Sequence, residues 1–119
     1  MTATEHATRL AGALAQAASV KLGIDIVALD VSAALAITDV FLLVSAANER
    51  QVGAIVDAID EAATGFGVPV TRREGEHERR WVLLDLNNVI VHIMMADDRQ
   101  MYSLERIWKD APRVVLEAG

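Results

Sequence analysis

An aspartate and a histidine in the C-terminal half are the residues most suited to chemistry. Two apolar runs, 81–85 and 89–95, flank Leu86-Asn87-Asn88, and this spacing predicts a β-hairpin that turns at the asparagines. In that register Asp85 and His92 are diagonal neighbours on one face of the hairpin. An aspartate beside a histidine can orient the imidazole for acid–base work or complete a metal site. Nothing in the sequence indicates that a serine, a cysteine or a second histidine lies beside this pair. We therefore interpret His92 as a buried histidine with a ring nitrogen bound by a carboxylate.

Three aspartates at or near strand ends offer a second kind of chemistry. Asp30, Asp39 and Asp85 could gather a divalent metal ion for nucleotidyl transfer. The chain, however, has no closely paired Asp-x-Asp carboxylates on a strand and no glycine-rich phosphate loop of the Walker kind. Aspartates at strand ends more often bind turn and cap amides. We favour that structural role and expect no metal ion, cofactor or catalytic residue, and keep a metal-dependent nucleotidyltransferase as the alternative.

The segment 72–80 is rich in arginine, a residue that often binds nucleic acid. Its four arginines alternate with Glu74, Glu76 and Glu78, and it contains no aromatic residue on which a base could stack. The whole chain carries a net charge of −6, which disfavours non-specific attraction to phosphates. We interpret the segment as a solvated loop and expect no direct sequence-specific contact with nucleic acid.

The composition predicts one cytoplasmic α/β domain. A chain of 119 residues is close to the usual size of a single domain. Although 53% of the residues are hydrophobic, no run approaches the roughly 20 apolar residues of a membrane span. The first nine residues lack the pattern of a secretory signal, and the absence of cysteine fits a reducing compartment.

Periodicity and capping residues predict the elements that position these side chains. A helix follows the capping-box pattern Thr2-Ala3-Thr4-Glu5 and ends at Gly23, and a second begins at Asn48 and ends at Gly65 and Gly67. Strands are predicted at 24–31, 39–45 and 68–71 in addition to the hairpin, and a last helix at about 98–109. The first two strands are apolar on both faces, which is typical of central strands covered by helices. The prediction is a mixed sheet of about five strands with helices packed on it.

Several motifs in this order resemble the ribosomal silencing factor family, the Iojap-related proteins. They are Ile26-Val27-Ala28-Leu29-Asp30-Val31, Ile37-Thr38-Asp39, Asn48-Glu49-Arg50-Gln51, Trp81-Val82-Leu83-Leu84-Asp85, Val89-Ile90-Val91-His92-Ile93, Arg99, Tyr102-Ser103-Leu104-Glu105-Arg106-Ile107-Trp108 and Asp110-Ala111-Pro112. The resemblance spans roughly residues 22–114. Asn87-Asn88 stands where members commonly have Gly-Asp.

The resemblance implies a nucleotidyltransferase-like core without its catalytic motif. It also implies a translational repressor that binds the fourteenth protein of the large ribosomal subunit and blocks joining of the small subunit. Members are often homodimers when free. Carried over residue by residue, the contact region places Trp81 and Leu86 as apolar anchors, with Asn88, Met94 and Tyr102 as neighbours.

These expectations define one domain over residues 1–119, with an N-terminal helix (1–22), a core (23–114) and a tail (115–119). The chemistry of the hairpin is consistent with docking, because Trp81 and two consecutive methionines can form an adaptable apolar surface. A dimeric structural module is a third reading. It predicts no association with ribosomes.

Overall fold

The computed structural model describes residues 3–102 and 104–116, and its centre is a mixed sheet of six strands. The strands are β1 (Ile24–Asp30), β2 (Val40–Ala46), β3 (Arg72–Glu74), β4 (Trp81–Asp85), β5 (Val89–Met95) and β6 (Arg113–Val114). Their spatial order is β3-β4-β5-β2-β1-β6. The β2 and β5 strands run parallel and every other neighbouring pair is antiparallel. The predicted α/β fold with a mixed sheet is confirmed.

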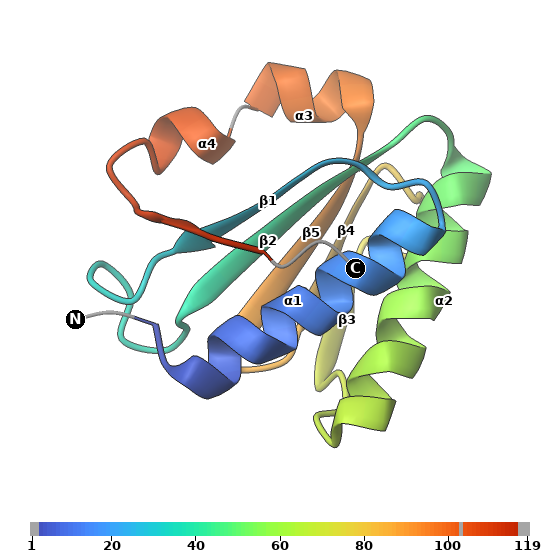
Figure 1. Cartoon of the computed structure of the whole chain (residues 1–119). Coiled ribbons are helices and arrows are strands. Elements are labelled where there is room, and N and C mark those ends of the chain that lie inside the picture. Colours follow the sequence, from blue (N-terminus) through green and yellow to red (C-terminus); the bar gives the residue numbers. More distant parts are fainter. Residues whose placement is uncertain (1–2, 103, 117–119) are drawn as a thin grey trace.

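Two long helices cover one face of this sheet, and Figure 1 shows them side by side across it. In α1 (Glu5–Val20), the Thr4 hydroxyl accepts a hydrogen bond from the Ala7 amide, so the cap is Thr4. In α2 (Glu49–Phe66), Asn48 is the cap, as predicted, and accepts from the Gln51 amide at 2.8 Å. The α2 helix ends at Gly67, whose φ of 87° lies in the left-handed region that glycine adopts without strain.

The main hydrophobic core lies between this face and the two helices. Alternate residues of the hairpin point into it, and all of them are at most 1% exposed: Val82, Leu84, Leu86, Val89, Val91 and Ile93. The helices contribute leucine, isoleucine, valine and alanine, and the alanines of α1 allow close approach to the sheet. We call this side the helix-covered face.

The opposite side of the sheet has a smaller core beneath the C-terminal segment. There, Leu29, Val31, Phe41 and Leu43 are buried, and Trp108 packs against them. Two short helices, α3 (Ala96–Tyr102) and α4 (Leu104–Ile107), cross above this part of the sheet (Figure 1). The α3 helix contacts β5 and β2. We call the side that carries Trp81, Phe41 and Trp108 the open face.

A buried arginine fastens α3 to the sheet. Arg99 is 7% exposed and donates to the Asp25 carbonyl in β1 and to the Ser45 hydroxyl in β2. Its guanidinium also forms two hydrogen bonds with the Glu105 carboxylate, at 3.2 and 3.1 Å. These bonds hold the pKa of Glu105 below its ordinary value. Asp25 lies in an irregularity of the β1 ladder and has φ of 50°, so Arg99 binds the carbonyl of a kinked strand.

Several predicted boundaries were wrong. The strand predicted at 68–71 is irregular, and β3 begins instead at Arg72, where the chain comes into register with Asp85. The predicted helix 98–109 consists of α3 and α4, and residue 103 lies outside the described residues. The two-residue β6 was not predicted. It pairs with β1, whose first residues are exposed, so β1 is less central than its apolar sequence suggests.

Candidate docking surface

Trp81 begins β4 and lies half-buried on the open face. Its side chain stands beside the half-buried Leu83 of the same strand, and Ile90 is also half-buried on the neighbouring strand. The predicted register is confirmed, because Trp81 pairs with Met94, Leu83 with His92 and Asp85 with Ile90. Alternation therefore places a tryptophan and two aliphatic side chains on the part of the sheet that α1 and α2 do not cover.

His92 binds Trp81 rather than the predicted carboxylate. The Trp81 indole N–H donates to His92 Nδ1 at 3.1 Å. His92 is 6% exposed, and burial lowers its pKa to about 4, so the ring is neutral at neutral pH. The predicted burial of His92 is thus confirmed and the predicted Asp85 partner is wrong. Although the two residues are diagonal in the ladder, Asp85 turns toward the hairpin loop.

Asp85 shapes the β4–β5 turn. Its carboxylate accepts from the Asn87 amide at 2.8 Å, and its second oxygen lies 3.9 Å from Arg72. Asn87 has φ of 70°, as its side chain favours, whereas Asn88 is not among the residues with positive φ. The Asn88 carbonyl accepts from the amides of Asp39 and Val40 and so joins the turn to the start of β2.

The other predicted contact residues differ in accessibility. Asn88 is exposed at the turn. Leu86 and Met94 are each 1% exposed, Leu86 in the core beneath the helices and Met94 across the ladder from Trp81. The Tyr102 side chain lies outside the described residues. In this fold, therefore, Trp81 and Asn88 are the predicted contacts that the described surface offers to a partner.

Asp30 and Asp39, which only the alternative interpretation treats as metal ligands, bind backbone amides, in line with the structural role favoured above. Asp30 accepts from the Ala3 amide and from the amide and hydroxyl of Ser32, and Asp39 accepts from the Thr4 amide. Burial acts to raise the pKa of Asp30, but the hydrogen bonds from Ser32 and Ala3 outweigh it and the pKa falls below its ordinary value. Within 3–102 and 104–116 no three His, Cys, Asp or Glu side chains are grouped so that they could hold a metal ion.

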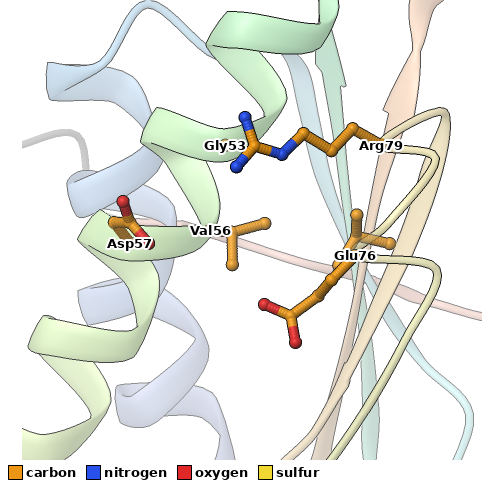
Figure 2. Close-up of a pocket in the computed structure, with 6 residues that line it drawn as sticks. Gly53, Val56, Asp57, Glu76 and Arg79 are labelled. Atoms are coloured by element: carbon orange, nitrogen blue, oxygen red, sulfur yellow. The ribbon is translucent and has the colours of Figure 1, made fainter.

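The arginines that approach Trp81 along the chain are engaged with their own protein. Arg73 pairs with Asp60 of α2 at 2.6 Å, and Arg80 pairs with Asp98 of α3 at 3.1 Å. Figure 2 shows Arg79 reaching over Gly53 of α2, at a cavity of about 80 Å³. A small-molecule site usually needs about 300 Å³ or more, so this cavity is too small for a substrate. Part of the predicted loop is the strand β3, and the rest is solvent-exposed as predicted.

Sequence reasoning missed three contributors. Leu83 lies beside Trp81 and Ile90 lies further along the same face, opposite Asp85, and the alternation of the hairpin was a sufficient signal to include them. Arg99 is among the residues that resemble the family, but nothing in the local pattern indicated that it is buried. An arginine in a charged helix reads as exposed, and only the packing of α3 against the β1 irregularity buries it.

This face and fold define an α/β protein whose distinctive surface is suited to docking rather than catalysis. A family model described as ribosomal silencing factor during starvation matches residues 4–118. The ribosomal silencing factor of Bacillus subtilis is 41% identical over 95 residues, which cover 80% of each chain. That of Haemophilus influenzae is 37% identical over 86 residues, which cover 72% of this chain and 84% of its own. The chain belongs to the ribosomal silencing factor RsfS family.

Solved structures show the same fold. A crystal structure from Bacillus halodurans is 36% identical and superposes with a TM-score of 0.75, covering 87% of this chain and 94% of its own. One from Chromobacterium violaceum is 25% identical with a TM-score of 0.82, covering 93% and 92%. Membership implies a non-catalytic factor that represses translation by binding ribosomes. Among the described helices none is long and apolar enough to cross a membrane.

Proposed function

We propose that this protein binds the fourteenth protein of the large ribosomal subunit through the open face around Trp81, and that its bulk then blocks joining of the small subunit. Family membership supports the ribosome as the target. The observation that carries the location is the half-buried tryptophan beside Leu83, with Ile90 further along the same face, on the part of the sheet that α1 and α2 do not cover.

The chemistry of this patch suits a protein partner. Tryptophan is enriched among the residues that contribute most to binding, and such residues lie in apolar centres ringed by polar groups. Around Trp81 the polar groups are the Arg80–Asp98 pair on one side and Asp85 with Arg72 at the far end of β4. Because these charges are already paired, docking would not leave an isolated charge buried.

A steric mechanism needs affinity and bulk but no reacting group. It is consistent with aspartates that bind backbone amides and with a histidine held neutral by burial. The free protein is predicted to be a homodimer. Its mass in solution, measured on the same preparation, tests that prediction separately.

Co-sedimentation with purified large and small ribosomal subunits tests the proposal. We expect binding to the large subunit alone, and Trp81→Ala should weaken it by about thirtyfold or more, because central tryptophans contribute about 2 kcal/mol or more. Val20→Ala is the matched control, since Val20 is an apolar residue that is 70% exposed at the end of α1. It should bind like the unchanged protein.

Circular dichroism must show that both variants are folded. Equal binding by the folded Trp81→Ala variant would remove the open face from the proposal. Cross-linking of the bound protein to large-subunit proteins tests the partner itself. A cross-link only to proteins other than the fourteenth would contradict the proposed contact.

A further inference from the structure

We propose that His92 is the positioning residue of the docking face, and that its Nδ1 atom holds the Trp81 indole in the orientation that a partner binds. This inference rests on the proposed function, because it assigns a role to Trp81 at the interface. It concerns a side chain that a partner need not touch.

The hydrogen bond joins residues from neighbouring strands. Trp81 pairs with Met94, and His92 pairs with Leu83 one step further along the face, so the two rings meet diagonally. Their centroids lie 6.0 Å apart with an interplanar angle of 53°, and the indole N–H donates to Nδ1 at 3.1 Å. The indole has a single N–H donor. A directed bond from it selects one side-chain orientation from those open to a half-buried tryptophan.

The acceptor is itself held in place by aromatic packing. The His92 ring meets Phe41 of β2 edge-on, with centroids 5.1 Å apart, and Phe41 meets Trp108 in the same way at 5.4 Å. Phe41 is 9% exposed and His92 6%. Trp81 is therefore bound to a buried histidine, and that histidine packs on the core under the C-terminal segment through Phe41. Fixing an anchor before binding reduces the entropy that association costs.

The protonation state of the ring is set by the same contact. Accepting from the indole requires a bare Nδ1, so the neutral ring carries its proton on Nε2. Burial lowers the pKa of His92 to about 4 and keeps this form at neutral pH. Among the described residues, the buried Nε2 atom has no hydrogen-bond partner.

The unpaired Nε2 atom helps to distinguish a positioning role for His92 from a purely structural one. A buried donor without a partner reduces stability, and an apolar side chain of similar volume would remove this cost. The bond from Trp81 stabilises the fold by about as much as the unpaired Nε2 destabilises it, so stability alone gives little reason for a histidine here. What a histidine supplies, and leucine cannot, is the acceptor for Trp81.

The test compares two substitutions in the full-length protein. His92→Leu removes the acceptor and keeps an apolar group, whereas His92→Asn places an amide oxygen near the position of Nδ1. We expect His92→Leu to unfold at no lower urea concentration than the unchanged protein, yet to bind large subunits about tenfold more weakly. His92→Asn should recover most of that affinity, although its polar side chain is less stable in the core.

Nuclear magnetic resonance of the free protein supplies a readout that does not depend on the ribosome. The Trp81 indole N–H resonance, assigned with Trp81→Phe, should exchange with water faster in His92→Leu, while the Trp108 resonance should keep its exchange rate. His92→Asn should restore slow exchange at Trp81.

The outcomes separate the two proposals. If Trp81→Ala weakens binding and the folded His92→Leu variant binds normally, the positioning role is overturned and the docking face stands. If His92→Leu leaves the exchange of the Trp81 indole unchanged, the positioning role is overturned whatever the binding. If the folded Trp81→Ala variant binds normally, the proposed docking through Trp81 is overturned, and the positioning role of His92 is overturned with it.

Discussion

The two faces of the sheet are stabilised in different ways. Under α1 and α2, the alternating residues of the hairpin are all aliphatic and almost fully buried. The open face has only the smaller core under the C-terminal segment, and beside it are directed polar and aromatic contacts: an indole bound to an imidazole, edge-on rings, and an arginine with a glutamate. Successive residues of β4 alternate between the two faces, so this one strand takes part in both.

This difference indicates a division of roles. Burial of aliphatic surface is non-directional and supplies most of the free energy of folding. Directed contacts contribute less to stability and more to holding particular side chains in one geometry. We therefore infer that the helix-covered face maintains the fold, whereas the open face arranges groups for a partner.

The largest expected difference is between two adjacent leucines of β4. Leu84 is fully buried beneath the helices, and Leu83 is half-buried beside Trp81. We expect Leu84→Ala to lower the free energy of unfolding by about 4 kcal/mol, because it leaves a cavity in the core, and Leu83→Ala by only about 1 kcal/mol. Urea denaturation measures both. Equal losses would mean that the two faces share the stabilisation and would contradict the division.

Acid should lower the stability of the protein through His92, which lies on the open face. His92 has a pKa of about 4 in the folded protein and an ordinary value of 6.5 when unfolded. Between these values only the unfolded chain binds the proton, so stability falls as the pH is lowered from 6.5 to 4, by up to about 3 kcal/mol. Stability should not depend on this group above pH 6.5.

Urea denaturation at a series of pH values measures this loss, and His92→Leu is the control. The variant should lose the dependence between pH 6.5 and 4. It should keep the further loss that comes from Glu105, because the lowered pKa of that carboxyl makes its stabilisation disappear as the pH falls below its ordinary value of 4.5. An identical profile in the variant would show that another group titrates.

The smallest expected effect concerns Gly53, which is half-buried on α2 beneath Arg79. A β-carbon there would come within 2.7 Å of Arg79 Nη1, which is the end of a flexible, exposed side chain and can shift (Figure 2). Alanine also favours a helix interior more than glycine. We therefore expect Gly53→Ala to raise stability by up to about 1 kcal/mol without changing ribosome binding. Thermal unfolding and co-sedimentation measure these, and a loss of stability would show that Arg79 is held firmly in place.

Much of the fold could be predicted from local patterns. The Asn48 cap, the Gly67 stop and the alternation of the hairpin depend on neighbours a few residues apart, and all three appear in the structure. The half-exposed position of Trp81 follows from the same alternation. The family could be inferred because its motifs occur in order along one chain.

The partners of individual polar groups could not be predicted in this way. His92 had Asp85 within reach in the ladder, yet it binds the Trp81 indole, since Asp85 is drawn to the Asn87 amide in its own turn. Arg99 is buried only because α3 folds back on the kinked β1 strand, 74 residues away along the chain. Sequence alone determined the two long helices, the central strands and the face that each hairpin residue occupies, because these depend on local periodicity. Tertiary structure decided which polar groups meet, because that depends on contacts between distant segments and on the cost of leaving a buried group unpaired.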